Sequence, residues 1–160
     1  TECLDINDLM NDVVDMYRPK WEAETHSRGV KIFIVKDLAP LPRIKANPSE
    51  LREVFGNIIL NAIEATNKDG VITIKSGFFD NNIQISISDT GTGIQKDLIP
   101  KIFEPFYTTK GIGHGTGLGL ATAYGIVKMH KGQITVESNT ETSAGPTGTT
   151  FRIILPRRKE

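Results

Sequence analysis

Asn57 and Asn61 are candidates for chemistry on a charged ligand, because they lie four residues apart and so share one face of a helix. Amide oxygens are hard ligands of the kind that Mg²⁺ accepts. Mg²⁺ commonly takes one or two protein ligands and completes its octahedron with water and phosphate oxygens. The pair therefore predicts a place for a magnesium ion that is carried by a phosphate.

The two asparagines belong to a polar stripe on a segment that is otherwise apolar. At roughly 100° per residue, one narrow arc holds Glu53, Asn57, Asn61 and Glu64. The opposite side carries Val54, Phe55, Ile58, Ile59, Ala62 and Ala65. A solvated helix face is the plain alternative. Asparagine, however, costs several tenths of a kcal/mol relative to alanine inside a helix, so a solvent face would more naturally carry Glu, Lys or Gln.

Asp89 ends a run in which Ile83, Ile85 and Ile87 alternate with polar residues, so its carboxylate is expected on the buried face of a sheet. A buried carboxylate needs a partner. The exocyclic amine of adenine is one such partner, since it donates hydrogen bonds while the ring fills apolar space. The alternative is that Asp89 begins a turn and bonds the backbone of Thr90–Gly93.

The same alternation places Thr149 in phase with Phe151, Ile153 and Leu155, which indicates a second inward polar group. Its hydroxyl is expected to support Asp89. Thr is also a common strand residue that bonds neighbouring backbone, and this alternative stays open.

Five alternating glycines occupy the run 111–119, of which Gly115, Gly117 and Gly119 lie where a loop becomes a helix. Glycine permits close backbone approach, and exposed amides at a helix start attract anions. The preceding residues 103–110 offer aromatic anchors for a lid, and Lys110 could reach a terminal phosphate. A glycine-rich loop can equally be merely flexible, and Lys110 can be a solvated charge.

Composition limits the classes of function. Lysine plus arginine equal aspartate plus glutamate at 19 each, so no global field attracts nucleic acid, which we do not expect as a partner. The single cysteine, Cys3, cannot form an internal disulfide, which favours a cytoplasmic setting. No apolar run approaches the roughly 20 residues of a membrane span, so we expect no direct membrane contact. Because the chain begins at Thr1, we expect a part of a longer protein whose remainder can be membrane-anchored.

Helical spacing predicts a first helix from Ile6 to about Thr25, with Asn7 and Asp8 available as caps and Pro19 as a bend or end. Asn47 and Pro48 predict the start of a second helix, which should end near Asn67. A third helix is expected from Thr116 to about His130. The stretch 95–116 holds a short helix and then a long Pro-, Gly- and Thr-rich loop.

Five strands are expected, the last two of them after the third helix: 30–35, 71–79, 83–89, 133–137 and 149–155. Residues 71–79 and 83–89 form a hairpin across a tight connection. We find no internal repeat or interdomain linker, so we predict one domain over residues 1–160. The fold class is α/β (α+β), a two-layer sandwich in which three main helices cover one face of a mixed five-stranded sheet.

With these features in place, the chain resembles the catalytic ATP-binding domain of two-component sensor histidine kinases. The resemblance covers nearly the whole chain. It rests on ordered motifs at residues 57–62, 89–94, 103–106, 115–120 and 148–151. Residues 61–66 and 106–110 look most like the nitrogen-regulation type.

The resemblance implies the Bergerat ATP-binding fold, with ATP and Mg²⁺ as cofactors. It implies transfer of the γ-phosphate to a histidine on a separate dimerisation and phosphoacceptor domain, and then to a response regulator receiver domain. Residues 1–5 would be the remnant of the linker from that missing domain. The nucleotide contacts would come from Asn57, Asn61, Ala65, Asp89, Gly91, Gly93, Ile94, Phe106, Thr108, Lys110, Gly115, Thr116, Gly117, Leu118, Gly119 and Thr149. Asn61 and Asn57 would hold the metal, and Asn57, Lys110 and Glu53 are the candidate catalytic residues.

The sequence also departs from a complete kinase. None of His26, His114 and His130 lies beside an acidic residue on a preceding helix, as the acceptor histidine of the family does. Relatives among DNA gyrase, the heat-shock chaperone and mismatch-repair ATPases carry a glutamate where this chain has Asn57. An amide cannot activate water as that glutamate does, which favours a kinase over a fast ATPase. The alternatives are a non-catalytic ATP-sensing module and a serine kinase of the anti-sigma type.

Overall fold

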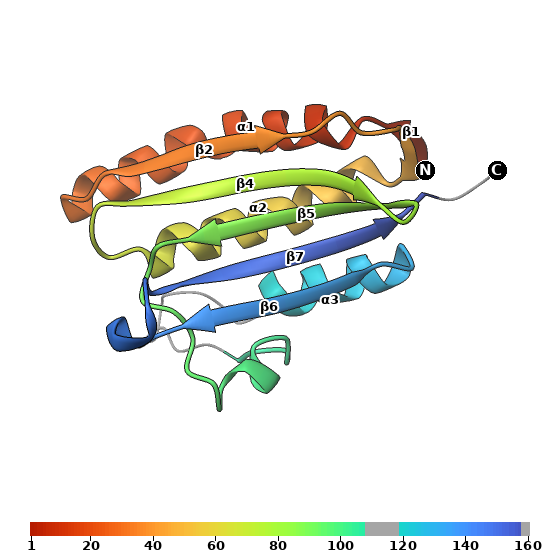
Figure 1. Ribbon diagram of the computed structural model, residues 1–160. Coiled ribbons are helices and arrows are strands. Elements are labelled where there is room, and N and C mark those ends of the chain that lie inside the picture. Colours follow the sequence, from red (N-terminus) through yellow and green to blue (C-terminus); the bar gives the residue numbers. More distant parts are fainter. Residues whose placement is uncertain (108–118, 158–160) are drawn as a thin grey trace.

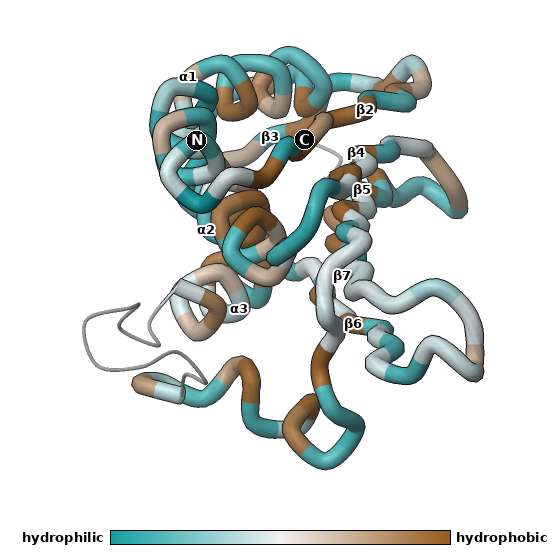
Figure 2. The backbone as a smooth tube through the Cα atoms, turned by 90° about the vertical axis from the view of Figure 1, so that its left-hand side faces the viewer, coloured by the Kyte–Doolittle hydropathy of each residue, from teal (hydrophilic) through white to brown (hydrophobic). Residues whose placement is uncertain are grey.

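The computed structural model describes residues 1–107 and 119–157, and in this part three α-helices cover one face of a five-stranded sheet (Figure 1). The helices are α1 (Ile6–Arg28), α2 (Pro48–Ala65) and α3 (Gly119–Met129). Figure 2, turned by 90°, shows the helices together on one side of the strands. The predicted two-layer α+β sandwich is confirmed.

The sheet has the strand order β2-β4-β5-β7-β6. Its strands are β2 (Ile32–Leu38), β4 (Gly70–Phe79), β5 (Asn82–Asp89), β6 (Gln133–Asn139) and β7 (Gly148–Pro156). β2 runs parallel to β4, whereas the other neighbouring pairs are antiparallel, so the sheet is mixed as expected. The positive φ angles of Asp80 and Asn81 make the tight β4–β5 hairpin connection.

Helix α1 is longer than the sequence suggested, and a different residue caps it. The N-cap is Asp5, whose side chain accepts from the amides of Asn7 and Asp8, the two residues expected as caps. Pro19 lies inside the helix, which continues to Arg28. Gly29 ends it with a φ of 70°, a left-handed conformation that suits glycine.

Helix α2 begins as predicted, with the Asn47 side chain accepting from the amide of Glu50 and with Pro48 in the first turn. It ends at Ala65, slightly before the expected Asn67.

Two further structural features were not predicted as such. Strand β1 (Glu2–Leu4) pairs with β3 (Ile44–Ala46) in a separate antiparallel sheet, so residues 2–4 are folded against the domain. Three-residue strands are too short to show a period in sequence. The short helix expected after residue 95 is a single 3₁₀ turn, η1 (Ile99–Lys101), and a second such turn, η2 (Thr142–Ala144), lies in the polar loop before β7.

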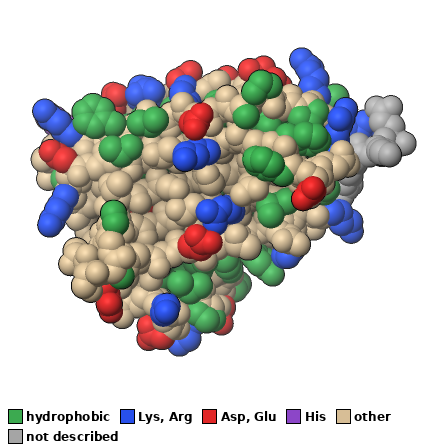
Figure 3. All heavy atoms as spheres, in the orientation of Figure 1, with side chains coloured by type: hydrophobic (Ala, Val, Ile, Leu, Met, Phe, Trp, Pro, Cys, Tyr) green, Lys and Arg blue, Asp and Glu red, His purple; other side chains and the backbone are tan. Residues whose placement is uncertain are grey.

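One hydrophobic core lies between sheet and helices. Alternate strand residues point into it against the apolar side of α2, and Ile72, Ile74, Ile85, Ile153, Phe55 and Ile58 are completely buried. The other face of the sheet, seen in Figure 3, carries mixed charged, polar and apolar side chains. Within residues 1–107 and 119–157, no helix has the length and apolar character required to cross a membrane.

Candidate functional site

Asp89 is the last residue of β5 and is only 7% exposed, on the helix-covered side of the sheet. One of its carboxylate oxygens, Oδ1, accepts from two backbone amides, at 2.9 Å from Gly91 and 3.2 Å from Thr149. The buried-face expectation and the turn-bonding alternative are therefore both correct for this side chain.

The other oxygen, Oδ2, has a different environment. Among the described residues, no fully enclosed side-chain nitrogen or oxygen lacks a hydrogen-bond partner. Within the described residues, both bonds to Asp89 reach Oδ1, and Oδ2 has no partner there. Burial raises the pKa of this carboxyl above its ordinary value, and the amides of Gly91 and Thr149 offset part of that rise. The site thus combines a desolvated carboxyl with one oxygen, Oδ1, that two backbone amides hold in place.

The loop after Asp89 is packed directly against the end of α2. The amide of Thr92 donates to the carbonyl of Ala65 at 3.1 Å. A Cβ on Gly91 would lie 2.3 Å from that same carbonyl oxygen, so only glycine fits there. Gly93 has a φ of 79°, and its missing Cβ would lie 2.2 Å from the Asn139 carbonyl. These glycines allow close backbone packing that fixes the loop.

Thr149 lies on the buried face as expected, at 4% exposure, but its hydroxyl does not act on Asp89 as predicted. Its backbone amide supports the carboxylate instead. The Thr149 hydroxyl pairs with Ser138 Oγ at 2.8 Å. Ser138 Oγ also accepts from the amide of Ile94 at 2.6 Å and donates to the carbonyl of Gly148 at 3.0 Å.

The asparagines of α2 lie beside the start of α3. Asn57 Nδ2 donates to the Gly119 carbonyl at 3.1 Å, which ties the two helices together. Asn61 and Glu64, further along the stripe, are partly buried, while Glu53 is exposed. The stripe is therefore not a plain solvated face over its whole length.

Several predicted site residues lie outside the described part of the chain: Thr108, Lys110, Gly115, Thr116, Gly117 and Leu118, together with His114. Before them, Phe106 is 73% exposed with a φ of 67°. The ring centroid of Phe103 lies 5.3 Å from that of Tyr124 and 6.3 Å from that of Phe151. Phe103 therefore packs its own stretch of chain against α3 and the core.

Two residues that organise this region were not predicted. Ser138 continues the inward alternation of Ile134 and Val136, so the argument that found Asp89 and Thr149 also applies to it. Arg28 donates to the carbonyls of Ile63 and Thr66, both at 3.1 Å, at the end of α2. Nothing in the sequence around Arg28, a basic residue in the last turn of α1, predicts that it bonds the end of α2.

The α2 side chains expected to hold a metal, Asn57 and Asn61, carry amide oxygens rather than carboxylates. No cluster of three or more His, Cys, Asp or Glu side chains there could hold a metal ion. Asn57 Nδ2 is engaged with Gly119, so Oδ1 is the atom that it can offer to a cation. This donor set fits an ion such as Mg²⁺ that arrives with phosphate and keeps its waters.

Residues 46–159 match the family described as histidine kinase-, DNA gyrase B-, and HSP90-like ATPase. Sensor histidine kinase ZraS of Escherichia coli (strain K12) is 36% identical over 156 residues, which are 97% of this chain and 31% of ZraS. The chain thus spans about a third of the length of that relative.

Solved structures of histidine kinases are similar to this fold over almost the whole chain. Full-length ShkA in complex with AMPPNP has a TM-score of 0.80 at 27% identity, covering 99% of this chain and 31% of ShkA. The catalytic domain of histidine kinase ThkA has a TM-score of 0.76 at 29% identity, covering 98% of this chain and 99% of that domain. ThkA in complex with the response regulator protein TrrA has a TM-score of 0.72 at 25% identity, covering 98% of this chain and 42% of the ThkA chain.

The family match covers most of the chain, and the fold agrees with a complete catalytic domain from end to end. This chain belongs to the histidine kinase-, DNA gyrase B-, and HSP90-like ATPase family.

Proposed function

We propose that residues 1–160 form one catalytic module, which binds ATP with Mg²⁺ and donates the γ-phosphate to a histidine on a separate dimerisation and phosphoacceptor domain. A response regulator receiver domain then accepts the phosphoryl group, and the module works in the cytoplasm, where ATP is supplied. Family membership and the AMPPNP complex of ShkA support ATP as the ligand. The name of ZraS and the ThkA–TrrA complex support two-component signalling.

The placement of the Asp89 carboxylate is the observation on which the proposal mainly rests. Its Oδ1 is fixed by two amides, which aims Oδ2 as a hydrogen-bond acceptor at the end of the buried strand. The exocyclic amine of adenine donates to such an acceptor. Guanine presents a carbonyl oxygen at the same ring position, and two acceptors facing each other repel. The site therefore selects ATP over GTP.

The stripe on α2 supplies the metal-binding groups. Asn61 and Asn57 present amide oxygens one helical turn apart, and Mg²⁺ held there would neutralise charge on the nucleotide phosphates. Asn57 is also tied to Gly119 at the start of α3, so the two helices keep this donor in place.

The identity of residue 57 favours a kinase. The amide of Asn57 cannot take a proton from water, so the site holds the phosphates without activating a hydrolytic nucleophile. Glu53, exposed one turn earlier, is the candidate group to orient the incoming acceptor or take its proton. Lys110 and the glycines of residues 115–119 are proposed to steady the phosphates, and the nitrogen-regulation subgroup stays a prediction.

Phosphoryl transfer to a supplied acceptor domain tests the function. The chain is mixed with γ-labelled ATP and the dimerisation and phosphoacceptor domain of the same kinase. We expect label on histidine, which is lost in acid. Acid-stable label would indicate the serine-kinase alternative, and ATP binding without any transfer would indicate a sensing module.

Replacing Asn61 tests the metal assignment. Asn61→Ala should abolish the Mg²⁺ dependence of ATP binding, measured by titrating the metal at fixed nucleotide. Asn67→Ala, an exposed asparagine just beyond the helix, is the matched control and should titrate as the unmodified chain does. An Asn61→Ala curve that superimposes on that of the unmodified chain rejects the role.

A further inference from the structure

Ser138 holds three segments around Asp89 through a single hydroxyl. Its Oγ contacts the amide of Ile94 from the loop after β5, the carbonyl of Gly148 and the hydroxyl of Thr149. It lies on β6, the edge strand beside β7 (Figure 1). The nucleotide contacts implied by the resemblance do not include this residue.

The count of protons on Ser138 fixes the direction of these bonds. A serine hydroxyl has one hydrogen to donate and two lone pairs that accept. The Ile94 amide uses one lone pair, and the Gly148 carbonyl takes the hydrogen. The remaining lone pair can only accept, so the Thr149 hydroxyl must donate to it. Thr149 Oγ1 is then left with lone pairs alone.

Thr149 and Asp89 are immediate neighbours, because the Thr149 amide donates to Asp89 Oδ1. Asp89 and Thr149 lie on the adjacent strands β5 and β7 and are both buried, so this side of the sheet carries two acceptors, Asp89 Oδ2 and the Thr149 hydroxyl oxygen. A ligand group that donates two hydrogens from one atom suits such a pair, directly or through a bridging water. The exocyclic amine of adenine is such a group.

We infer that Ser138 is a positioning residue for purine recognition: it makes Thr149 an acceptor and pins the loop at Ile94, so that the site reads the 6-amino group of adenine. This inference rests on the proposed function, since it concerns the same nucleotide site. Ser138 itself touches no ligand and acts through Thr149 and the loop.

The outer face of the sheet supplies a matched control. Ser88 and Thr150 form a serine–threonine hydroxyl pair at 2.7 Å, between β5 and β7. Both residues alternate away from the buried positions Asp89 and Thr149, so this pair faces away from the site. Ser88→Ala removes a bond of the same chemistry with no route to the nucleotide.

Calorimetric titration of the full chain with ADP and with purine riboside diphosphate, which lacks the 6-amino group, tests the inference. We expect Ser138→Ala to weaken ADP binding about fivefold to tenfold, the effect of one or two lost hydrogen bonds. The affinity for purine riboside diphosphate should fall much less, so the preference for ADP over this analogue should become smaller. Ser88→Ala should leave both affinities unchanged.

A double-mutant cycle with Thr149→Val separates positioning from a general structural role. In the Thr149→Val background, Ser138→Ala should change the ADP preference little further, whereas independent effects would multiply. Ser138→Thr, which keeps the hydroxyl, should restore the preference. Ser138→Cys keeps the size of the side chain with a weak donor, and it serves the same comparison if the alanine variant does not fold.

The outcomes distinguish this inference from the proposed function. If the unmodified chain binds neither ADP nor ATP, the proposed function fails. If the unmodified chain prefers ADP and Ser138→Ala keeps the same preference, Ser138 has no positioning role. An equal loss for ADP and the analogue, not restored by Ser138→Thr, likewise overturns the inference in favour of a purely structural contact.

Discussion

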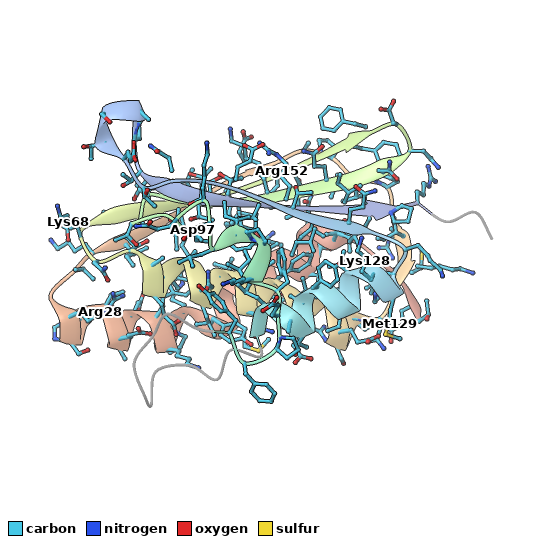
Figure 4. The ribbon with its side chains drawn as sticks, turned by 90° about the horizontal axis from the view of Figure 1, so that it is seen from below. Arg28, Lys68, Asp97, Lys128, Met129 and Arg152 are labelled. Atoms are coloured by element: carbon cyan, nitrogen blue, oxygen red, sulfur yellow. The ribbon has the colours of Figure 1, made fainter. Side chains whose placement is uncertain are left out.

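The backbone groups at the two ends of helix α2 are hydrogen-bonded by different parts of the chain. At its N-terminal end, Asn47 caps the helix with its own side chain, and its backbone amide donates to His130 Nε2 at 3.2 Å. At its C-terminal end, the carbonyls of Ile63 and Thr66 accept from Arg28, and that of Ala65 accepts from Thr92. Figure 4 shows Arg28 and Lys68 at one end of the molecule and Lys128 and Met129 at the other.

This difference shows how one helix serves both stability and binding. The N-terminal end is completed by the side chain of Asn47 and by His130 just after α3, and neither contact involves the loop that carries Gly91. The C-terminal end is completed by a loop that comes from β5, so satisfying the carbonyl of Ala65 also places Gly91, the amide partner of Asp89. Changes at the C-terminal end should therefore alter nucleotide binding, and changes at the N-terminal end should alter stability alone.

Gly91→Ala should break the C-terminal arrangement most severely. The new Cβ would lie 2.3 Å from the Ala65 oxygen and 3.0 Å from Asp89 Oδ1, so the loop must shift. Overpacking of this kind costs about 1–3 kcal/mol of unfolding free energy. We also expect at least about a tenfold loss of ATP affinity, since Asp89 loses a fixed partner. Chemical denaturation and nucleotide titration measure the two effects.

Gly125→Ala is the control for that substitution. Gly125 is an exposed position inside α3 with no atom within 4 Å of the added Cβ. Alanine is favoured over glycine in a helix, so this variant should be about 0.5–1 kcal/mol more stable and should bind ATP unchanged. Similar behaviour of the two variants would mean that the close approach at Gly91 carries no special constraint.

Asp89→Asn should weaken ATP binding by about 1.5–3 kcal/mol, the range for hydrogen bonds to charged groups. The new side-chain amide keeps an oxygen for the backbone amides of Gly91 and Thr149, and it puts a donor where Oδ2 was. The loss should therefore be smaller for GTP, whose 6-oxo group accepts. Asp97→Asn, at an exposed position, is the control. Unchanged ATP affinity in Asp89→Asn would refute the adenine assignment.

The same substitution should have the opposite effect on stability. Because burial raises the pKa of Asp89 above 3.8, the folded chain holds this proton more tightly than the unfolded chain. Stability contributed by the protonated carboxyl is lost as pH rises from the unfolded pKa through the folded pKa. Asp89→Asn should thus be more stable than the unmodified chain at neutral pH, with the difference falling as pH is lowered. Melting curves across pH would reject this if the difference stayed constant.

Strand alternation made much of the site predictable. The inward parity of Ile83, Ile85 and Ile87 correctly placed Asp89 on the buried face, and the same rule placed Thr149. Periodicity and caps likewise located α2 and the five strands, because those signals are local. The rule fixes the face on which a side chain lies but not its hydrogen-bond partner, so it did not reveal that the Thr149 hydroxyl bonds Ser138.

Contacts between distant segments were not predictable in this way. Arg28 reaches carbonyls more than 30 residues away, and the Thr92–Ala65 bond depends on how the loop meets the helix. The Asp5 cap was missed because Asn7 and Asp8 are equally good capping residues. The sequence limits which groups can bond, and the packing of sheet against helices decides which of them do.

His130→Ala should have the smallest of these effects, confined to the N-terminal end of α2. Since Nε2 accepts from the Asn47 amide, Nδ1 carries the hydrogen of the neutral ring and donates to the Ile126 carbonyl at 2.9 Å. Losing this bridge between α3 and α2 should cost about 1 kcal/mol of unfolding free energy. ATP affinity should stay within about twofold of the unmodified chain, because the loop that carries Gly91 meets the other end of the helix. Denaturant titration and calorimetry of one protein sample measure both quantities, and a tenfold loss of affinity without a loss of stability would show that the two ends of α2 are not separable.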